Sequence, residues 1–283
     1  MIFWIASYPK SGNTWLRALL SAYYYTKDGD FLEGECLKHI DQFPRKEFFE
    51  NYEFDKNVPG DNVKYSLNAQ QNINKDKKIK FFKTHNALVN LNNYEFTNNL
   101  YSIGCIYIVR DPRNVISSLS NHFELESTEA LDFMLNEKKF IYDYQKKNDY
   151  SDFQFLGSWK NHYTSWTNNQ IIPIKLVKYE DLAEKTYEVF KDIILFINKI
   201  CKSKIQFDKN KAKKSIVSTS FNKLKKLEIK KGFLEASISK KNNQKIPFFF
   251  KGPENHWAKN FNENFISKIN AIFEDDLKIL NYI

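Results

Sequence analysis

The chain has 283 residues and a formal net charge of +9, and 42% of its residues are hydrophobic, including 25 Phe and 16 Tyr. This composition suits a domain with a large core and argues against disorder. No stretch approaches the roughly 18 apolar residues of a membrane span, and the short apolar start lacks a signal peptide's basic flank. Cys36, Cys105 and Cys201 are scattered without metal-ligand spacing. We therefore expect a cytoplasmic protein without bound metal.

The positive charge is concentrated in one segment. Residues 201–245 contain 14 Lys, but their acidic residues are only Asp208, Glu228 and Glu235. Such a segment can bind nucleic acid, form a solvated face or attract a small anion. Arginine is scarce by comparison, and its guanidinium binds phosphate or carboxylate in a bidentate manner, so each arginine in this Lys-rich chain indicates such recognition. The arginines are Arg17, Arg45, Arg110 and Arg113.

Apolar runs of strand length alternate with segments of helical periodicity along the chain. This pattern predicts an α/β fold, with a central parallel sheet flanked by helices. Because no internal repeat or linker divides the sequence, we expect one domain over residues 1–283. The predicted strands are residues 2–6, 79–83, 104–109 and 174–177. The predicted helices are residues 15–25, a helix starting at Asp111-Pro112, residues 153–166, a helix from 179 to about 200, and residues 261–280.

The polar turn between the first strand and the first helix has the features of an anion site. In an α/β fold the free N–H groups at this helix end attract phosphate, and Gly12 lets the backbone approach a ligand closely. Lys10 adds a full charge, and Ser11, Asn13 and Thr14 add side-chain donors. Lys10 precedes the glycine, so this P-loop-like turn is not a Walker A motif.

Two further segments carry candidate functional groups. Arg110 follows a buried strand, and Ser118 lies about two turns into the next helix, so both can reach one ligand or Arg110 can pair with a carboxylate. In Lys83-Thr84-His85, which ends the second strand, the imidazole can serve as a general base near neutral pH or pack as an ordinary side chain.

These three segments, in this order, resemble the cytosolic sulfotransferases that use 3′-phosphoadenosine-5′-phosphosulfate (PAPS). The likeness runs from residue 2 to about residue 261, with Asn13 in place of the family's more usual Thr. One such motif could arise by chance, but seven occur in register. They are Tyr8–Trp15, Lys83-Thr84-His85, Tyr107–Phe123, Gly157-Ser158-Trp159 with His162, Tyr179-Glu180-Asp181, Thr219-Ser220-Phe221, and Lys251-Gly252 with Trp257.

The resemblance implies sulfuryl transfer from PAPS to a small acceptor, without a metal. His85 would take the acceptor proton, and Lys10 with Lys83 beside it would stabilise the bridging oxygen as the S–O bond breaks. Arg110 and Ser118 would hold the 3′-phosphate of the donor, and the second product would be 3′-phosphoadenosine-5′-phosphate (PAP). The remaining nucleotide-binding residues implied are Ser11, Gly12, Asn13, Thr14, Trp15, Tyr179, Thr219, Phe221, Lys251 and Gly252, with Trp15 and Phe221 around the adenine.

The sequence departs from the family late in the chain. Phe250 stands where the family has an arginine that contacts the phosphate, so we expect Arg113 or the Lys-rich segment to compensate, or the 3′-phosphate to be held less tightly. The dimerisation signature is degraded at residues 258–265, which leaves the oligomeric state open. Residues 26–78, read as a loop-and-helix excursion, and residues 231–250 should form the acceptor pocket, but they follow no pattern that identifies the acceptor.

Two other functions share some of these features. A nucleotide-dependent kinase also places a phosphate loop on an α/β sheet, although Lys10 is misplaced for it and no Walker B carboxylate follows a strand. A non-catalytic binder of nucleotides or nucleic acid could use the Lys-rich segment. His85 separates these readings, because a binding module has no use for a base. We therefore expect a small acceptor rather than a nucleic-acid partner.

Overall fold

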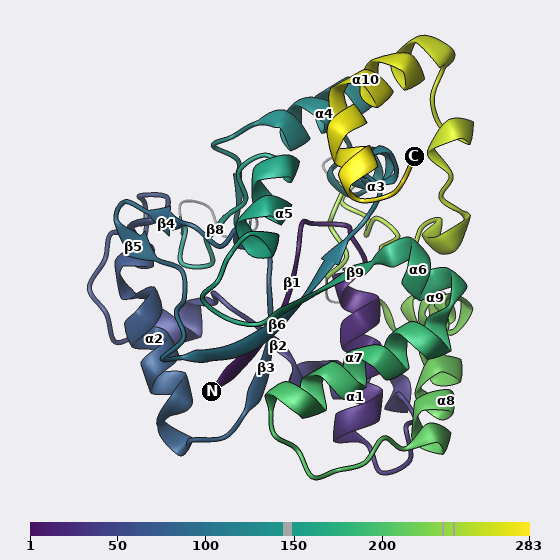
Figure 1. Ribbon diagram of the computed structural model, residues 1–283. Coiled ribbons are helices and arrows are strands. Elements are labelled where there is room, and N and C mark those ends of the chain that lie inside the picture. Colours follow the sequence, from purple (N-terminus) through teal and green to yellow (C-terminus); the bar gives the residue numbers. More distant parts are fainter. Residues whose placement is uncertain (144–148, 234, 240) are drawn as a thin grey trace.

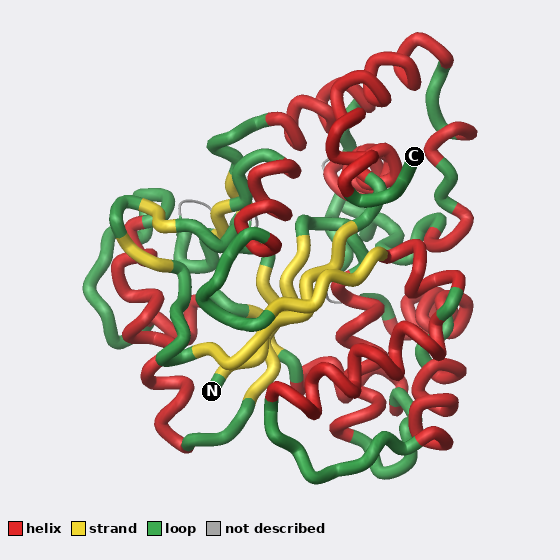
Figure 2. The backbone as a smooth tube through the Cα atoms, viewed as in Figure 1, coloured by secondary structure: helices red, strands yellow, loops and turns green. Residues whose placement is uncertain are grey.

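The computed structural model describes residues 1–143, 149–233, 235–239 and 241–283. At its centre lies a five-stranded parallel sheet with the order β2-β3-β1-β6-β9, and helices cover both faces (Figure 1, Figure 2). The α/β class predicted from the sequence is confirmed. The five strands are β1 (Ile2–Ser7), β2 (Asp41–Gln42), β3 (Lys80–Thr84), β6 (Ser102–Val109) and β9 (Ile174–Lys178).

The central strand β1 is buried on both faces. Trp4 belongs to one hydrophobic core and Phe3 with Ile5 to the other, as expected for side chains that alternate across a strand. The Trp4 face packs against α2 (Ser66–Ile73), α3 (Pro112–Phe123), α4 (Ser127–Leu135), α5 (Trp159–Thr167) and α10 (Glu263–Ile279). The Phe3 face packs against α1 (Asn13–Tyr25), α6 (Tyr179–Glu184), α7 (Thr186–Ile200) and α8 (Lys209–Ser218). A third, smaller core joins α1 to α9 (Phe221–Lys231).

The predicted strands are confirmed to within two residues at each end. The helix predicted over residues 153–166 is wrong in its first part, because Gln154–Phe155 form β8, which pairs with β7 (Phe140–Ile141). Gly157 has a φ of +65°, and the Ser158 side chain caps α5 by accepting from the Asn161 N–H, so the helix begins only at Trp159. The edge strand β2 was not predicted, because Asp41–Gln42 has no apolar pattern.

Residues 26–78 form the expected excursion of loops and short helices. A hairpin, β4 (Asn90–Leu91) with β5 (Tyr94–Glu95), follows β3. None of the helices in the described residues is long and apolar enough to cross a membrane. The 3-10 helices are η1 (Leu32–His39), η2 (Lys46–Phe49), η3 (Asp61–Tyr65) and η4 (Asn74–Asp76), with η5 (Gly252–Glu254) and η6 (Trp257–Lys259) nearer the C-terminus.

The topology brings the predicted site residues to one edge of the sheet. From β1 the chain builds β2 and β3 on one side, then crosses to β6 and β9 on the other, so the strand order reverses between β1 and β6. Ligands of open α/β sheets bind at the carboxyl ends of the strands beside such a switch point. The residues that directly follow β1, β3, β6 and β9 include Lys10, His85, Arg110 and Tyr179, respectively.

Candidate active site

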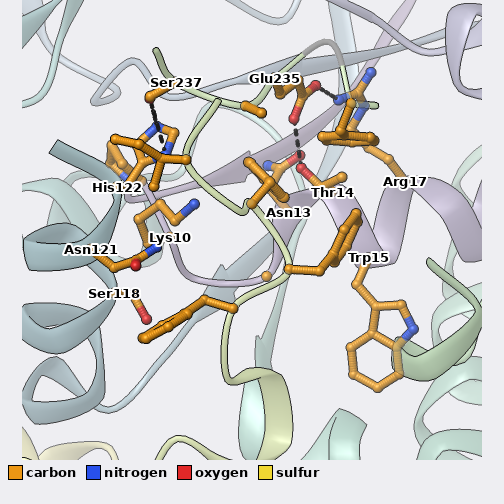
Figure 3. A pocket seen from close by; sticks show the side chains of 18 of the residues that line it. Lys10, Asn13, Thr14, Trp15, Arg17, Ser118, Asn121, His122, Glu235 and Ser237 are labelled. Atoms are coloured by element: carbon orange, nitrogen blue, oxygen red, sulfur yellow. Dashed lines mark hydrogen bonds and ion pairs between the residues drawn. The ribbon is translucent and has the colours of Figure 1, made fainter. Parts of the chain in front are cut away.

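The carboxyl ends of the strands open into a cavity of about 1750 Å³. This exceeds the roughly 300–1,000 Å³ of an ordinary small-molecule site, so it has the volume for two ligands. Figure 3 shows Lys10, Thr14 and His122 around it, from the loop after β1, from α1 and from α3. The predicted site residues that line it are Lys10, Gly12, Asn13, Thr14, Trp15, Lys83, His85, Arg110, Ser118, Tyr179, Phe221, Lys251 and Gly252.

Ser11 and Thr219 do not line this cavity. Ser11 is fully buried, and its hydroxyl has no hydrogen-bond partner among the described residues. The Thr219 hydroxyl donates to the Ser215 carbonyl of its own helix, at 2.8 Å, and the side chain is also buried. Ligand contacts from these two side chains therefore stay a prediction.

The loop between β1 and α1 has an unusual backbone at the edge of the cavity. Lys10 has a φ of 67° and Gly12, the N-cap of α1, a φ of 99°. The Asn13 amide fixes the turn by donating to the Ile5 carbonyl at 2.9 Å and to the Ser7 hydroxyl at 3.2 Å. The first turn of α1 thus has a rigid position from which its free N–H groups and positive dipole end can hold an anion.

Lys10 and Lys83 reach the same cavity from different strands, and Lys83 is buried whereas Lys10 is half-buried. Burial lowers the pKa of Lys10 to about 7, with Glu235 opposing the shift and Lys83 adding to it. Burial also lowers the pKa of Lys83, again with Glu235 as the opposing charge. The Lys10 ammonium lies 3.9 Å from the centre of the Phe248 ring. Such desolvated cations interact strongly with an anion that enters the cavity.

His85 is held in a defined orientation by hydrogen bonds to its ring and to its backbone carbonyl. Its Nδ1 lies 2.7 Å from the Ser7 carbonyl, which can only accept a hydrogen bond, so Nδ1 carries the proton and Nε2 has a free lone pair. Its backbone carbonyl accepts from His162 Nε2 at 2.9 Å, and Tyr107 donates to the other His162 nitrogen at 2.7 Å. Burial, followed by the charge of Lys83, holds the pKa of His85 well below its usual value. The imidazole is therefore neutral and basic at physiological pH.

Arg110 joins three parts of the site through its guanidinium. Nη1 donates to the Ser118 hydroxyl at 3.3 Å and to the Lys10 carbonyl at 3.2 Å. Nη2 donates to the Gly252 carbonyl at 3.2 Å, and the guanidinium lies 4.2 Å from the centre of the Tyr179 ring. The buried Nε has no hydrogen-bond partner in the described part of the chain. An unmatched buried donor beside Ser118 fits an anionic ligand group at this point.

Aromatic rings line the cavity beside Arg110. Trp15 packs edge-on against Tyr179, with ring centres 5.8 Å apart, and Phe221 lies at the start of α9. Gly252 keeps this region open, because a Cβ there would lie 2.3 Å from the Phe221 ring. Flat rings and a close glycine suit a planar heterocycle such as a nucleobase.

Phe250 stands where the family has a phosphate-binding arginine, and the structure shows where the residues that could replace this arginine lie. Arg113 does not line the cavity: it forms an ion pair with Asp111, donates to Asn270 and lies against the Trp257 ring. The suggestion that Arg113 compensates for the missing arginine is therefore not supported. Lys225, from the Lys-rich segment, donates to the Phe250 carbonyl at 3.4 Å and also does not line the cavity, whereas Lys231 of the same segment does.

Two pairs of cavity residues were not assigned a role from the sequence. Glu235 forms an ion pair with Arg17, and the Ser237 hydroxyl lies 3.2 and 3.1 Å from the two ring nitrogens of His122 (Figure 3). The scarcity of arginine pointed correctly to a carboxylate or phosphate partner for Arg17. No local pattern identified the other three, because their partners are far away in the sequence. Among the described residues, no cluster of three or more His, Cys, Asp and Glu is placed to hold a metal.

Comparison with known proteins relates the chain to enzymes of one kind. A family model described as a sulfotransferase domain matches residues 2–281. Cytosolic sulfotransferase 16 of Arabidopsis thaliana is 23% identical over 280 residues, which are 98% of this chain and 76% of that protein. Luciferin sulfotransferase of Photinus pyralis is 25% identical over 225 residues, which are 78% of this chain and 56% of that protein.

Solved structures share the fold along nearly the whole chain. A mouse sulfotransferase complexed with PAP has a TM-score of 0.57 at 17% identity, and the match covers 98% of this chain and 84% of that one. Retinol dehydratase, in complex with androsterone and the inactive cofactor PAP, has a TM-score of 0.60 at 15% identity, with coverages of 98% and 80%. At these identities the likeness shows the fold.

The geometry of Gly12 predicts a specific cost of substitution. In Gly12→Ala the new Cβ would lie 2.4 Å from Cδ2 of Tyr179, in addition to the strain of a positive φ. Gly157→Ala is the matched control, because its φ is also positive but its nearest atom lies at an ordinary 3.5 Å. The control should lose about 1–2 kcal/mol of unfolding free energy from backbone strain alone, and Gly12→Ala clearly more. Urea unfolding measures both, and equal losses would contradict the close packing of Tyr179 on the loop.

Proposed function

The chain belongs to the sulfotransferase domain family, and on this premise we propose that it transfers the sulfuryl group of PAPS to a hydroxyl or amine of a small acceptor. One observation carries the proposal. Lys10, Lys83 and Arg110 reach one cavity from the ends of three neighbouring strands, beside a helix N-terminus and the free nitrogen of His85. We treat residues 1–283 as one domain that carries both the donor and the acceptor sites.

The donor half of the site follows from the anion-binding groups. The loop around Gly12 and the first turn of α1 would hold the 5′-phosphosulfate, and Arg110 with Ser118 the 3′-phosphate. Trp15 and Phe221 would enclose the adenine. Both solved structures are complexes with PAP, which supports this nucleotide. Lys10 and Lys83 would neutralise the bridging oxygen, which becomes negative as the S–O bond breaks.

The acceptor half would lie on the other side of Lys10, where His85, His122 and the aromatic residues Phe233 and Phe248 line the cavity. An in-line transfer needs the acceptor oxygen or nitrogen opposite the leaving group, and a neutral base close enough to take its proton. The apolar walls suit a ring-bearing acceptor. A relative named for luciferin and a solved structure in complex with androsterone support a small molecule as the acceptor. The Arabidopsis relatives, which are named cytosolic sulfotransferases, support a cytoplasmic location.

The direct test of this function is a turnover screen. Purified protein with PAPS is offered phenols, steroid and aliphatic alcohols, and amines, and the release of PAP is followed together with the mass of the acceptor. We expect the mass to rise by one sulfuryl group for each PAP released. PAP release without acceptor modification, or transfer from ATP instead, would contradict the proposal.

His85 provides the first prediction for the acceptor identified in this way. In His85→Asn the base is lost, so kcat should fall by roughly 10² or more, while the affinity for PAP stays within a few-fold. His122→Asn removes the other imidazole of the cavity and should reduce kcat much less. Comparable losses in the two variants would remove the base role from His85.

Lys10 predicts a pH dependence of nucleotide binding. A bound anion raises the pKa of Lys10 above its free value of about 7, so binding is strongest when Lys10 is charged and weakens as the pH rises through 7 toward 9. Calorimetry near pH 8, in two buffers of different ionisation enthalpy, should show proton uptake when PAP binds. Lys10→Arg stays charged throughout this range, so its proton uptake should be much smaller. Equal proton uptake by the parent protein and Lys10→Arg would show that a group other than Lys10 takes up the proton when PAP binds.

Arg110 predicts how the protein distinguishes nucleotides. A charge-assisted contact to the 3′-phosphate is worth about 1.5–3 kcal/mol, so Arg110→Ala should weaken PAP roughly tenfold to a hundredfold. The variant also loses contacts to Lys10, Gly252 and Tyr179, and binding of adenosine 5′-phosphate reports that general damage. Calorimetry of both nucleotides on both proteins gives the coupling energy. A coupling near zero would show that Arg110 is only structural.

A further inference from the structure

Glu235 is a half-buried carboxylate among the cations of the site, and the proposed reaction does not use it. Figure 3 shows it between Thr14 and Arg17. Thr14 donates to one carboxylate oxygen at 2.7 Å, and Arg17 forms an ion pair with the other. The Lys83 ammonium lies 3.4 Å from the oxygen that Arg17 contacts. Side chains of α1 and β3 therefore converge on a carboxylate more than 150 positions away in the sequence.

The segment that carries Glu235 crosses from one side of the cavity to the other. Within residues 235–239, Glu235 contacts α1 and β3, and the Ser237 hydroxyl contacts His122 of α3. Ser239 donates to Glu124, directly after α3, at 2.7 Å. Glu235 thus connects one end of this segment, which forms part of the cavity wall, to α1 and to Lys83 of β3.

Stability alone does not account for this arrangement. The side chains of Arg17 and Lys83 are 7% and 8% exposed, and that of Glu235 is 28% exposed. An ion pair largely removed from water commonly repays little more than the cost of desolvating its charges. A local function for the carboxylate is the alternative. Its partner Lys83 is one of the two lysines that face the leaving group under the proposed function.

We propose that Glu235 is a positioning residue for sulfuryl transfer: its carboxylate holds the Lys83 ammonium beside the phosphosulfate loop and supplies the counter-charge for the lysines that act on the leaving group. The proposal rests on the proposed function. Arg17 keeps Glu235 in place from the side of α1, so the carboxylate can remain there when the nucleotide anion binds Lys10.

The surrounding charges support this role. Burial lowers the pKa of Lys83, and Glu235 is the charge that opposes this shift most strongly, against the neighbouring Arg17 and Arg45. It also raises the pKa of Lys10, together with the more distant Glu228, against burial, Lys83 and Arg110. For Glu235 itself burial favours the neutral acid, but Lys83, Arg17 and the Thr14 hydroxyl outweigh it and hold the pKa far below its usual value. The carboxylate is therefore charged at every pH at which the lysines titrate.

The test is the isosteric variant Glu235→Gln. Without the negative charge the lysines lose their protons at lower pH, so the alkaline limb of the kcat profile should move down by about one pH unit. Glu235→Asp keeps the charge and should recover part of the shift. Glu228→Gln is the matched control, because Glu228 binds the backbone N–H groups of Phe248 and Phe249 without contacting Lys83. This control should move the limb much less.

A second readout does not depend on turnover. An NMR titration of the lysine side chains in nucleotide-free protein, with Lys83 assigned from Lys83→Met, should show its midpoint lower in Glu235→Gln but not in Glu228→Gln. If the parent protein shows no sulfuryl transfer, the proposed function fails, and this titration still decides whether Glu235 holds the charge of Lys83. An unchanged midpoint overturns the proposal. An increase in kcat/KM for PAPS in Glu235→Gln also overturns it, because the carboxylate would then compete with the donor.

Discussion

Buried positive charge at one edge of a parallel sheet is the constraint on which the rest of this structure depends. Lys10, Lys83 and Arg110 are drawn there by the ends of three adjacent strands, and Arg17 by the first helix. Charges withdrawn from water are unfavourable unless they meet a counter-charge. The chain supplies one such charge in Glu235, and a nucleotide with two anionic groups supplies the others. The same desolvation that weakens the hold of Lys10 on its proton strengthens its attraction for a ligand anion.

The chemistry follows from this distribution of charge. An imidazole can take a proton only while it is neutral, and burial together with the charge of Lys83 keeps His85 neutral by lowering its pKa. Under the proposed function, acceptor activation by His85 and leaving-group stabilisation by Lys83 are therefore electrostatically coupled, because the two residues lie two positions apart at the end of β3. Phosphoryl transfer by P-loop enzymes has similar demands, but there the lysine follows the glycines and metal ions neutralise the phosphates. Here the cations come from the chain itself.

The sequence predicted the parts of the site that follow strands. Apolar strands such as residues 104–109 can be recognised locally, and the next polar residue then marks the sheet edge, which is how Lys10, His85 and Arg110 were identified. Glu235 could not be found in this way, since its partners on α1 and β3 are distant in the sequence. Even so, each acidic residue of the Lys-rich segment has a specific structural partner: Asp208 caps α8, Glu228 binds the backbone at Phe248 and Phe249, and Glu235 meets Lys83. The scarcity of acidic residues in the Lys-rich segment was therefore the sequence feature that could have pointed to a structural role for each of them.

The central claim is that the cations of the chain, rather than a bound metal, hold a nucleotide with a 3′-phosphate and a 5′-phosphosulfate. The most direct measurement is a calorimetric titration of the purified protein with PAP in the presence of EDTA, beside one with ATP and Mg²⁺. The account predicts that PAP binds at one site per chain without metal, and more tightly than ATP. Failure of PAP to bind under these conditions, or tighter binding of ATP with Mg²⁺, would contradict it.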